Sequence, residues 1–248
     1  MASFTPTASV DDPRLALDDC GNVPPVRGGG GDDGEPWPGS PDYGTRLRRA
    51  RLGLFVALIP VLMLFVSFTS AYVVRQGLPS LDVRTNQMVR DWIPVQLPIL
   101  LLANTCILLL STASMEFARR QTKREAVLSP AELLPRDLFG DERAMPWLAL
   151  TIFLGISFLT GQWLAWRELA TRGYYVSTSP SSSFIYLLTG AHAIHLMGGV
   201  LALFVAGGAA LLRRPAPTRS ILVDITSWYW HFMALLWVYI LCLLEFAH

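Results

Sequence analysis

Charged residues are confined to the stretches between five long apolar runs of the sequence. The uncharged runs contain 23, 24, 23, 40 and 20 residues and lie between Arg51 and Arg75, Asp91 and Glu116, Arg143 and Arg167, Arg172 and Arg213, and Asp224 and Glu245. A helix needs roughly 20 apolar residues to cross the hydrocarbon core of a bilayer. The pattern therefore predicts an all-α integral membrane bundle of five transmembrane helices, over residues 52–74, 92–113, 147–166, 184–212 and 225–244.

The composition narrows the class of protein further. Of the 248 residues, 52% are hydrophobic and 16% are charged, whereas soluble domains average about 25% charged residues. A soluble globular enzyme, a nucleic-acid binder and a disordered regulator are excluded. Residues 1–45 differ from the rest because they are rich in Gly, Pro and Asp and cannot bury enough apolar surface to fold. We expect a disordered tail there, followed by a transmembrane domain over residues 46–248.

The distribution of Lys and Arg predicts the orientation of the chain. Of the 20 basic residues, fifteen precede the first run or lie between the second and third or the fourth and fifth runs, and five lie in the remaining connections. Cytoplasmic loops carry the excess of Lys and Arg. The N-terminus is therefore expected in the cytoplasm and the C-terminus outside, in a bacterial inner (plasma) membrane.

Acidic residues are found at the ends of the runs and not near their middles. Glu116, Glu168, Asp224 and Glu245 all occupy such end positions, where water or lipid headgroups are expected to solvate them. Pumps and secondary transporters normally need an ionisable group at depth in the membrane. A self-contained pump is therefore disfavoured.

Three histidines lie within the last two runs. His192 and His195 are three residues apart and share a helix face, and His231 lies in the last run. They are either the ligands of a metal ion or neutral imidazoles that form hydrogen bonds between helices. A metal site of this kind usually includes a carboxylate, and no carboxylate lies at that depth. The second interpretation is favoured, so we expect no metal site and no catalytic residue in this chain.

Small and aromatic residues accompany these histidines. Gly190, Gly198 and Gly199 permit close approach of helices and predict a packing seam between the fourth and fifth spans. Trp230 and Trp237 are seven residues apart and share one face of the last span. This face is either a packed aromatic surface or, together with His231, a groove that contacts lipid.

Two segments resemble motifs of a known family. They are Thr189-Gly190-Ala-His192-Ala-Ile-His195-Leu-Met-Gly198-Gly199 and Trp228-Tyr229-Trp230-His231-Phe-Met-Ala234-Leu-Leu-Trp237. In this order they resemble the TGxHxxHxxxG and WYWHFVDxxW patterns of subunit III of the haem–copper oxidases. The likeness extends over residues 50–248, and the five spans resemble the short bacterial form of that subunit.

The resemblance implies an accessory, non-catalytic subunit of a cytochrome c oxidase-type terminal oxidase, whose complex couples oxygen reduction to proton translocation. Haem and copper would be held by partner subunits, and this chain would stabilise subunit I, contact subunit II and hold structural phospholipid. One alternative is the analogous subunit of a nitric oxide reductase. Another is a stand-alone small membrane haem protein or carrier.

The chain departs from the family pattern at two acidic positions. Val61 stands where the family often has a buried Glu, and Ala234 stands where it has the Asp of the last motif. Asp224 retains a carboxylate where the family usually has Glu. A role in proton uptake that depends on the buried Glu is therefore not implied for this chain.

Overall fold

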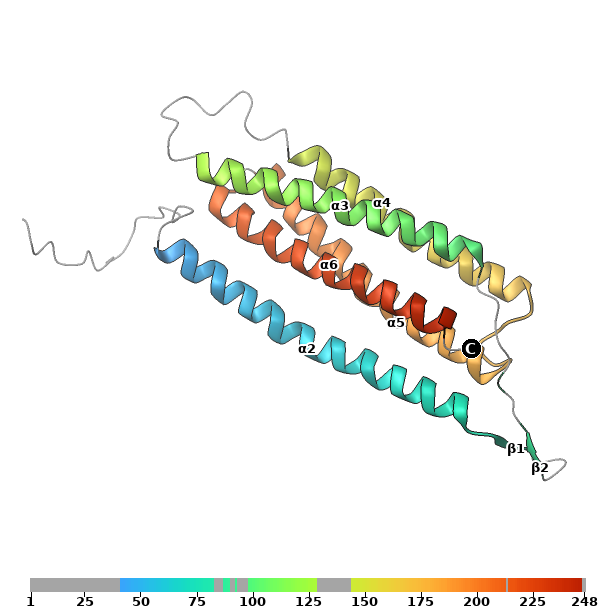
Figure 1. The fold of residues 1–248 in the computed structure, drawn as a ribbon. Helices are drawn as coiled ribbons and strands as arrows, with labels where there is room; N and C mark the ends of the chain where they lie inside the picture. Colours follow the sequence, from blue (N-terminus) through green and yellow to red (C-terminus); the bar gives the residue numbers. More distant parts are fainter. Residues whose placement is uncertain are drawn as a thin grey trace, which may run out of the picture. The chain divides into compact units, whose positions relative to one another are not determined.

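Five long helices form the framework of the protein. The computed structural model describes residues 41–82, 87–89, 92, 98–128, 144–212 and 214–246. Five helices in these ranges are long and apolar enough to cross a membrane, so the predicted five-span, all-α bundle is confirmed. In chain order (Figure 1) the elements are α2 (Pro41–Gly77), β1 (Ser80–Asp82), β2 (Gln87–Val89), α3 (Ile99–Leu128), α4 (Met145–Thr171), α5 (Pro180–Leu211) and α6 (Ala216–Phe246).

The first helix begins earlier than the predicted domain boundary. α2 starts at Pro41, so the helix includes residues 41–45. Proline suits the first turn of a helix, because the N–H that it lacks would have no partner there. The predicted disorder of residues 1–40 lies outside the described residues.

The bounds of α3 and α6 also differ from the predicted spans. α3 begins at Ile99, directly after Pro98, and not at residue 92; it continues to Leu128, well past the predicted end at 113. α6 begins at Ala216 and not at residue 225. The apolar runs marked the part of each helix that suits hydrocarbon, whereas the helices themselves continue into polar sequence.

A short antiparallel hairpin connects α2 to α3. β1 pairs with β2 in a register that places Ser80 opposite Val89 and Asp82 opposite Gln87. Each strand has only three residues. The hairpin lies beyond the end of α2, outside the helical bundle (Figure 1), and the bundle itself is all-α.

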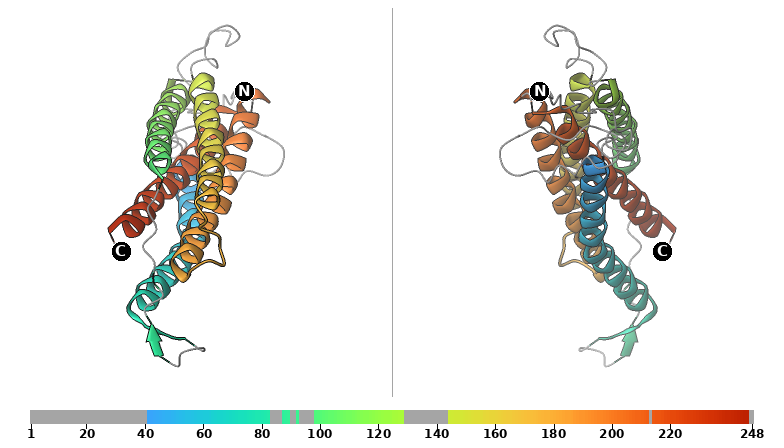
Figure 2. Two further views of the ribbon diagram at one scale, coloured as in Figure 1. Left: turned by 90° about the vertical axis from the view of Figure 1, so that its right-hand side faces the viewer. Right: turned by 90° about the vertical axis from the view of Figure 1, so that its left-hand side faces the viewer.

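Four of the helices close into a bundle, and the fifth lies against its side. α3 packs on α4 and α6, and α5 packs on the same two helices. α2 contacts α5 and α6 (Figures 1 and 2). In the most apolar stretch of α2, 11% of the residues are buried, whereas 33–39% are buried in the corresponding stretches of the other four helices. Most of the surface of α2 is therefore available to lipid or to another protein.

Polar side chains of α3 bind α4 directly. Asn104 Nδ2 donates to the carbonyl oxygen of Phe158 at 3.0 Å, and Ser114 Oγ donates to that of Trp147 at 3.0 Å. The Asn104 amide fits only because α4 carries Gly161 at this level: a Cβ added there would lie 2.4 Å from Asn104 Oδ1. Hydrogen bonds and close approach thus replace the hydrophobic driving force that is absent between helices in lipid.

We expect Gly161→Ala to destabilise the protein by about 1–3 kcal/mol, because the new methyl group must displace the Asn104 side chain. The measurement is the midpoint of thermal unfolding in detergent. Gly208→Ala is the matched control, since a Cβ there meets nothing within 4 Å, and helix propensity should leave it neutral or slightly stabilised. Equal effects of the two substitutions would contradict the packing described.

Candidate functional site

The motif glycines of α5 lie against the motif aromatics of α6. A Cβ added at Gly199 would come within 2.9 Å of the Tyr229 ring and 3.2 Å of the Trp230 ring. Gly198 is more open, with its added Cβ 3.8 Å from the Tyr229 hydroxyl. That hydroxyl donates to the carbonyl oxygen of His195 at 2.8 Å. The structure thus places a small, polar seam between the fourth and fifth spans.

The beginning of the same motif binds α4. Thr189 Oγ1 accepts a hydrogen bond from Trp166 Nε1 at 3.0 Å and donates to the carbonyl oxygen of Ile185 at 2.6 Å. A Cβ added at Gly190 would lie 3.9 Å from the Trp166 ring. Both functions of the Thr189 hydroxyl are therefore satisfied within the bundle.

Trp230 packs inside the protein. The alternative interpretation from the sequence, contact with lipid, does not apply to this side chain. Its side chain is 0% exposed, and added Cβ atoms at Gly155 on α4 and Gly199 on α5 would come within 2.8 and 3.2 Å of its ring. Its Nε1 donates to Ser111 Oγ on α3 at 3.2 Å. The indole fills the space that two glycines leave at the centre of the four-helix bundle.

Trp237 is also buried, at 1% exposure. Its Nε1 donates to Thr105 Oγ1 on α3 at 2.9 Å. Its ring packs edge-on to Phe158 and lies 5.0 Å, centre to centre, from the imidazole of His192. Trp230 and Trp237 share one face as predicted, but that face is the interior, because α6 crosses both α3 and α5.

The three histidines occupy separate surroundings. His192 is fully buried between Phe158 and Trp237. His195 Nδ1 lies 2.7 Å from the carbonyl oxygen of Ala191 in its own helix. His231 lies beside α3, with its Nε2 3.5 Å from the Glu116 carboxylate. Within the described ranges, no group of three or more His, Cys, Asp or Glu side chains is arranged to hold a metal ion.

Asp224 is the centre of an ion-pair network that joins three helices. Its carboxylate, on α6, lies 2.8 Å from Arg51 on α2 and 2.9 Å from both Arg119 and Lys123 on α3. The side chain is only 1% exposed. Water or headgroups therefore do not solvate this carboxylate, contrary to expectation, because three cations surround it.

Glu116 extends the network along α3. It pairs with Arg119 and Arg120, each at 2.9 Å, and faces His231 on α6. The partners of Asp224 were not predicted from the sequence. A signal was present: Arg119 and Lys123 follow the second apolar run, Arg51 precedes the first, and Asp224 precedes the fifth. The predicted topology puts all of these positions on one side of the membrane.

The two positions where the family has acidic residues are apolar and packed here. Ala234 is 3% exposed, and Val61 is partly buried against the core. A carboxylate at either position would need a new partner inside the bundle.

These contacts define a class of protein: a helical, multi-pass membrane protein whose polar side chains join its helices. The sequence model of one family, described as cytochrome c oxidase subunit III, matches residues 45–246. The match includes both motifs and most of the chain. The chain therefore belongs to the cytochrome c oxidase subunit III family.

Curated relatives agree with this assignment. A probable cytochrome c oxidase subunit 3 of Mycobacterium tuberculosis is 34% identical over 113 residues, which are 44% of this chain and 53% of that protein. Its Mycobacterium leprae counterpart is 29% identical over 110 residues, with the same shares covered. The cytochrome c oxidase subunit 3 of Triticum aestivum is 25% identical over 77% of this chain and 65% of that protein. The chain spans about half the length of the mycobacterial relatives it matches.

We expect Asp224→Asn to lower the free energy of unfolding by about 2–4 kcal/mol, because three gathered cations lose their counter-charge. Chemical unfolding of the detergent-solubilised protein measures the change. The matched control is Glu168→Gln, which breaks an exposed ion pair with Arg172 and should cost less than about 1 kcal/mol. A cost for Asp224→Asn no larger than that of the control would contradict the role of the network.

Proposed function

We propose that this chain is an accessory, non-catalytic subunit of a cytochrome c oxidase complex in a bacterial plasma membrane. Its partners are the haem–copper catalytic subunit I and subunit II, which carry the redox groups. The complex reduces oxygen and translocates protons, and this chain stabilises subunit I within the membrane. Its N-terminus lies in the cytoplasm and its C-terminus outside.

The observation that carries this proposal is the family match over residues 45–246, which contains both motifs. The relatives from Mycobacterium and Triticum aestivum bear the name cytochrome c oxidase subunit 3. None of these names supports either alternative, a subunit of a nitric oxide reductase or a stand-alone membrane haem protein or carrier.

The bonding of the motif side chains supports a structural role. Thr189 binds Trp166, Tyr229 binds the backbone at His195, and Trp230 binds Ser111. These three bonds hold neighbouring helices together. We assign haem and copper to the partner subunits.

The outward face of α2 supports an association within the membrane. Large apolar side chains on this helix are about half exposed, among them Phe55 at 49% and Ile59 at 53%. Such a surface suits both lipid and a helix of another subunit. The structural phospholipid that we propose for this chain does not contact Trp230 or Trp237, since both are buried.

The test is to purify the tagged chain from mildly solubilised membranes of the organism that makes it. We expect a large multi-span subunit containing haem and copper to accompany the chain, as shown by subunit composition, metal content and a reduced-minus-oxidised spectrum. The chain separated from its partners should show no haem band. Haem in proportion to the isolated chain, a partner with haem but no copper, or no partner at all would contradict the proposal.

A further inference from the structure

The two histidines of the α5 motif differ in their hydrogen bonding. His195 Nδ1 lies 2.7 Å from the carbonyl oxygen of Ala191, whereas neither Nδ1 nor Nε2 of His192 has a hydrogen-bond partner among the described residues. The His192 side chain is 0% exposed. A neutral imidazole carries one N–H donor and one bare nitrogen that accepts. Nearly all buried groups of this kind are paired with protein or with ordered water.

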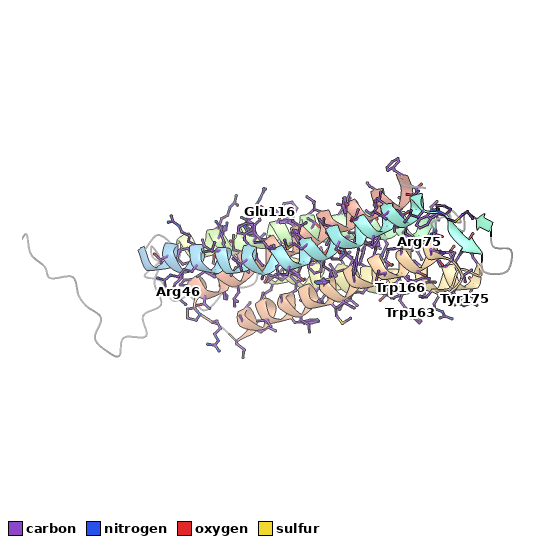
Figure 3. The ribbon with its side chains drawn as sticks, turned by 90° about the horizontal axis from the view of Figure 1, so that it is seen from below. Arg46, Arg75, Glu116, Trp163, Trp166 and Tyr175 are labelled. Carbon is purple, nitrogen blue, oxygen red and sulfur yellow. The ribbon has the colours of Figure 1, made fainter. Side chains whose placement is uncertain are left out.

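Gln162 on α4 is in the same position. Its side chain is 2% exposed, and its Oε1 has no partner in the part of the chain that the structure describes. Gln162 lies one turn inward of Trp166, which Figure 3 shows toward the end of the bundle that also carries Arg75 and Tyr175. The amide therefore lies within the apolar part of α4, where an unpaired polar group is costly.

The packing of α4 on α5 brings these two side chains to the same place. Phe158 precedes Gln162 by one turn on the same face of α4, and its ring centre lies 6.0 Å from that of His192. One turn beyond Gln162, Trp166 Nε1 donates to Thr189 Oγ1 at 3.0 Å. Thr189 lies three residues before His192 on α5. Gln162 is therefore held between the two contacts and faces the turn of α5 that carries His192.

Aromatic rings close the space around His192. Its ring centre lies 6.0 Å from that of Phe158 and 5.0 Å from that of Trp237. The indole N–H of Trp237 does not serve the imidazole, because it donates to Thr105 Oγ1. Bulk water does not reach a side chain that is 0% exposed. Any hydrogen-bond partner of the imidazole is therefore enclosed within the bundle.

We infer that His192 and Gln162 bind internal water, with one water molecule bridging a ring nitrogen of His192 and Gln162 Oε1. Water can accept from the imidazole N–H, and it can donate both to the bare ring nitrogen and to the amide oxygen. An apolar molecule would leave all of these atoms unpaired. Water bound there is part of the folded protein and links α4 to α5 one turn inward of the hydrogen bond between Trp166 and Thr189.

This inference concerns only the interior of the chain, so it can fail or succeed independently of the proposed role in an oxidase. The experiment uses the full-length chain, with its native partners where it has them, embedded in lipid. Its histidines, four in all, are labelled with nitrogen-15. Solid-state NMR then measures the transfer of magnetisation from water protons to each ring nitrogen, and the spectrum of His192→Phe identifies the His192 signals.

We expect transfer from water to the His192 ring in the native protein. In Gln162→Met, the transfer to one of the two ring nitrogens should be lost, because this substitution keeps the length of the side chain and removes the amide. Gln121→Met on α3 is the matched control: the oxygen of Gln121 is also buried and unpartnered among the described residues, and the His192 signals should not change. Absence of transfer in the native protein, or equal transfer in the two variants, would overturn the inference.

A second measurement keeps the test valid if Gln162→Met does not fold. A high-resolution electron cryomicroscopy map of the native protein should show density for water between His192 and Gln162. Its centre should lie about 2.7–3.2 Å from a ring nitrogen and from Oε1. A direct hydrogen bond between the two side chains, or contact of the imidazole with apolar atoms alone, would overturn the inference.

Discussion

Inside the hydrocarbon core of a membrane, a polar side chain must find its partner within the protein, because neither bulk water nor lipid chains can supply one. In this bundle several such partners lie on other helices. Asn104 on α3 binds the backbone of α4, and Tyr229 on α6 binds that of α5. At one end of the bundle, outside the apolar runs, the Asp224 carboxylate on α6 binds cations of α2 and α3. Each bond fixes the rotation of one helix against another. The arrangement of all five helices depends on them.

Glycine and tryptophan act together in this arrangement. The indole of Trp230 occupies the centre of the four-helix bundle because Gly155 and Gly199 leave room for it on two neighbouring helices. Its Nε1 reaches a third neighbour through Ser111. One side chain therefore sets the separation of α6 from three helices at once. This explains why the motif places small residues on α5 and a bulky aromatic on α6.

The sequence was sufficient to predict the five spans and their order, because a bilayer excludes long charged stretches from its core. The ends of the helices were harder to predict. α3 continues to Leu128 through polar residues, and apolar runs do not reveal the part of a helix that extends beyond the hydrocarbon core. Whether Trp230 faces protein or lipid was also beyond the sequence, since apolar residues cover all sides of this helix. The partner of His231 was missed because Glu116 lies on a different helix, at a rotation that only packing determines.

The contact between Arg51 and Asp224 joins α2 to α6, elements that lie far apart along the chain. During synthesis α2 enters the membrane before α6, so the counter-ion of Arg51 arrives only when α6 follows. Phe65 on α2 also packs against a ring that arrives late, the imidazole of His195 on α5. Until then α2 must persist as a single helix in lipid, which its largely apolar surface allows. The order of synthesis therefore means that the salt bridge between α2 and α6 can form only after all five of these helices have been made.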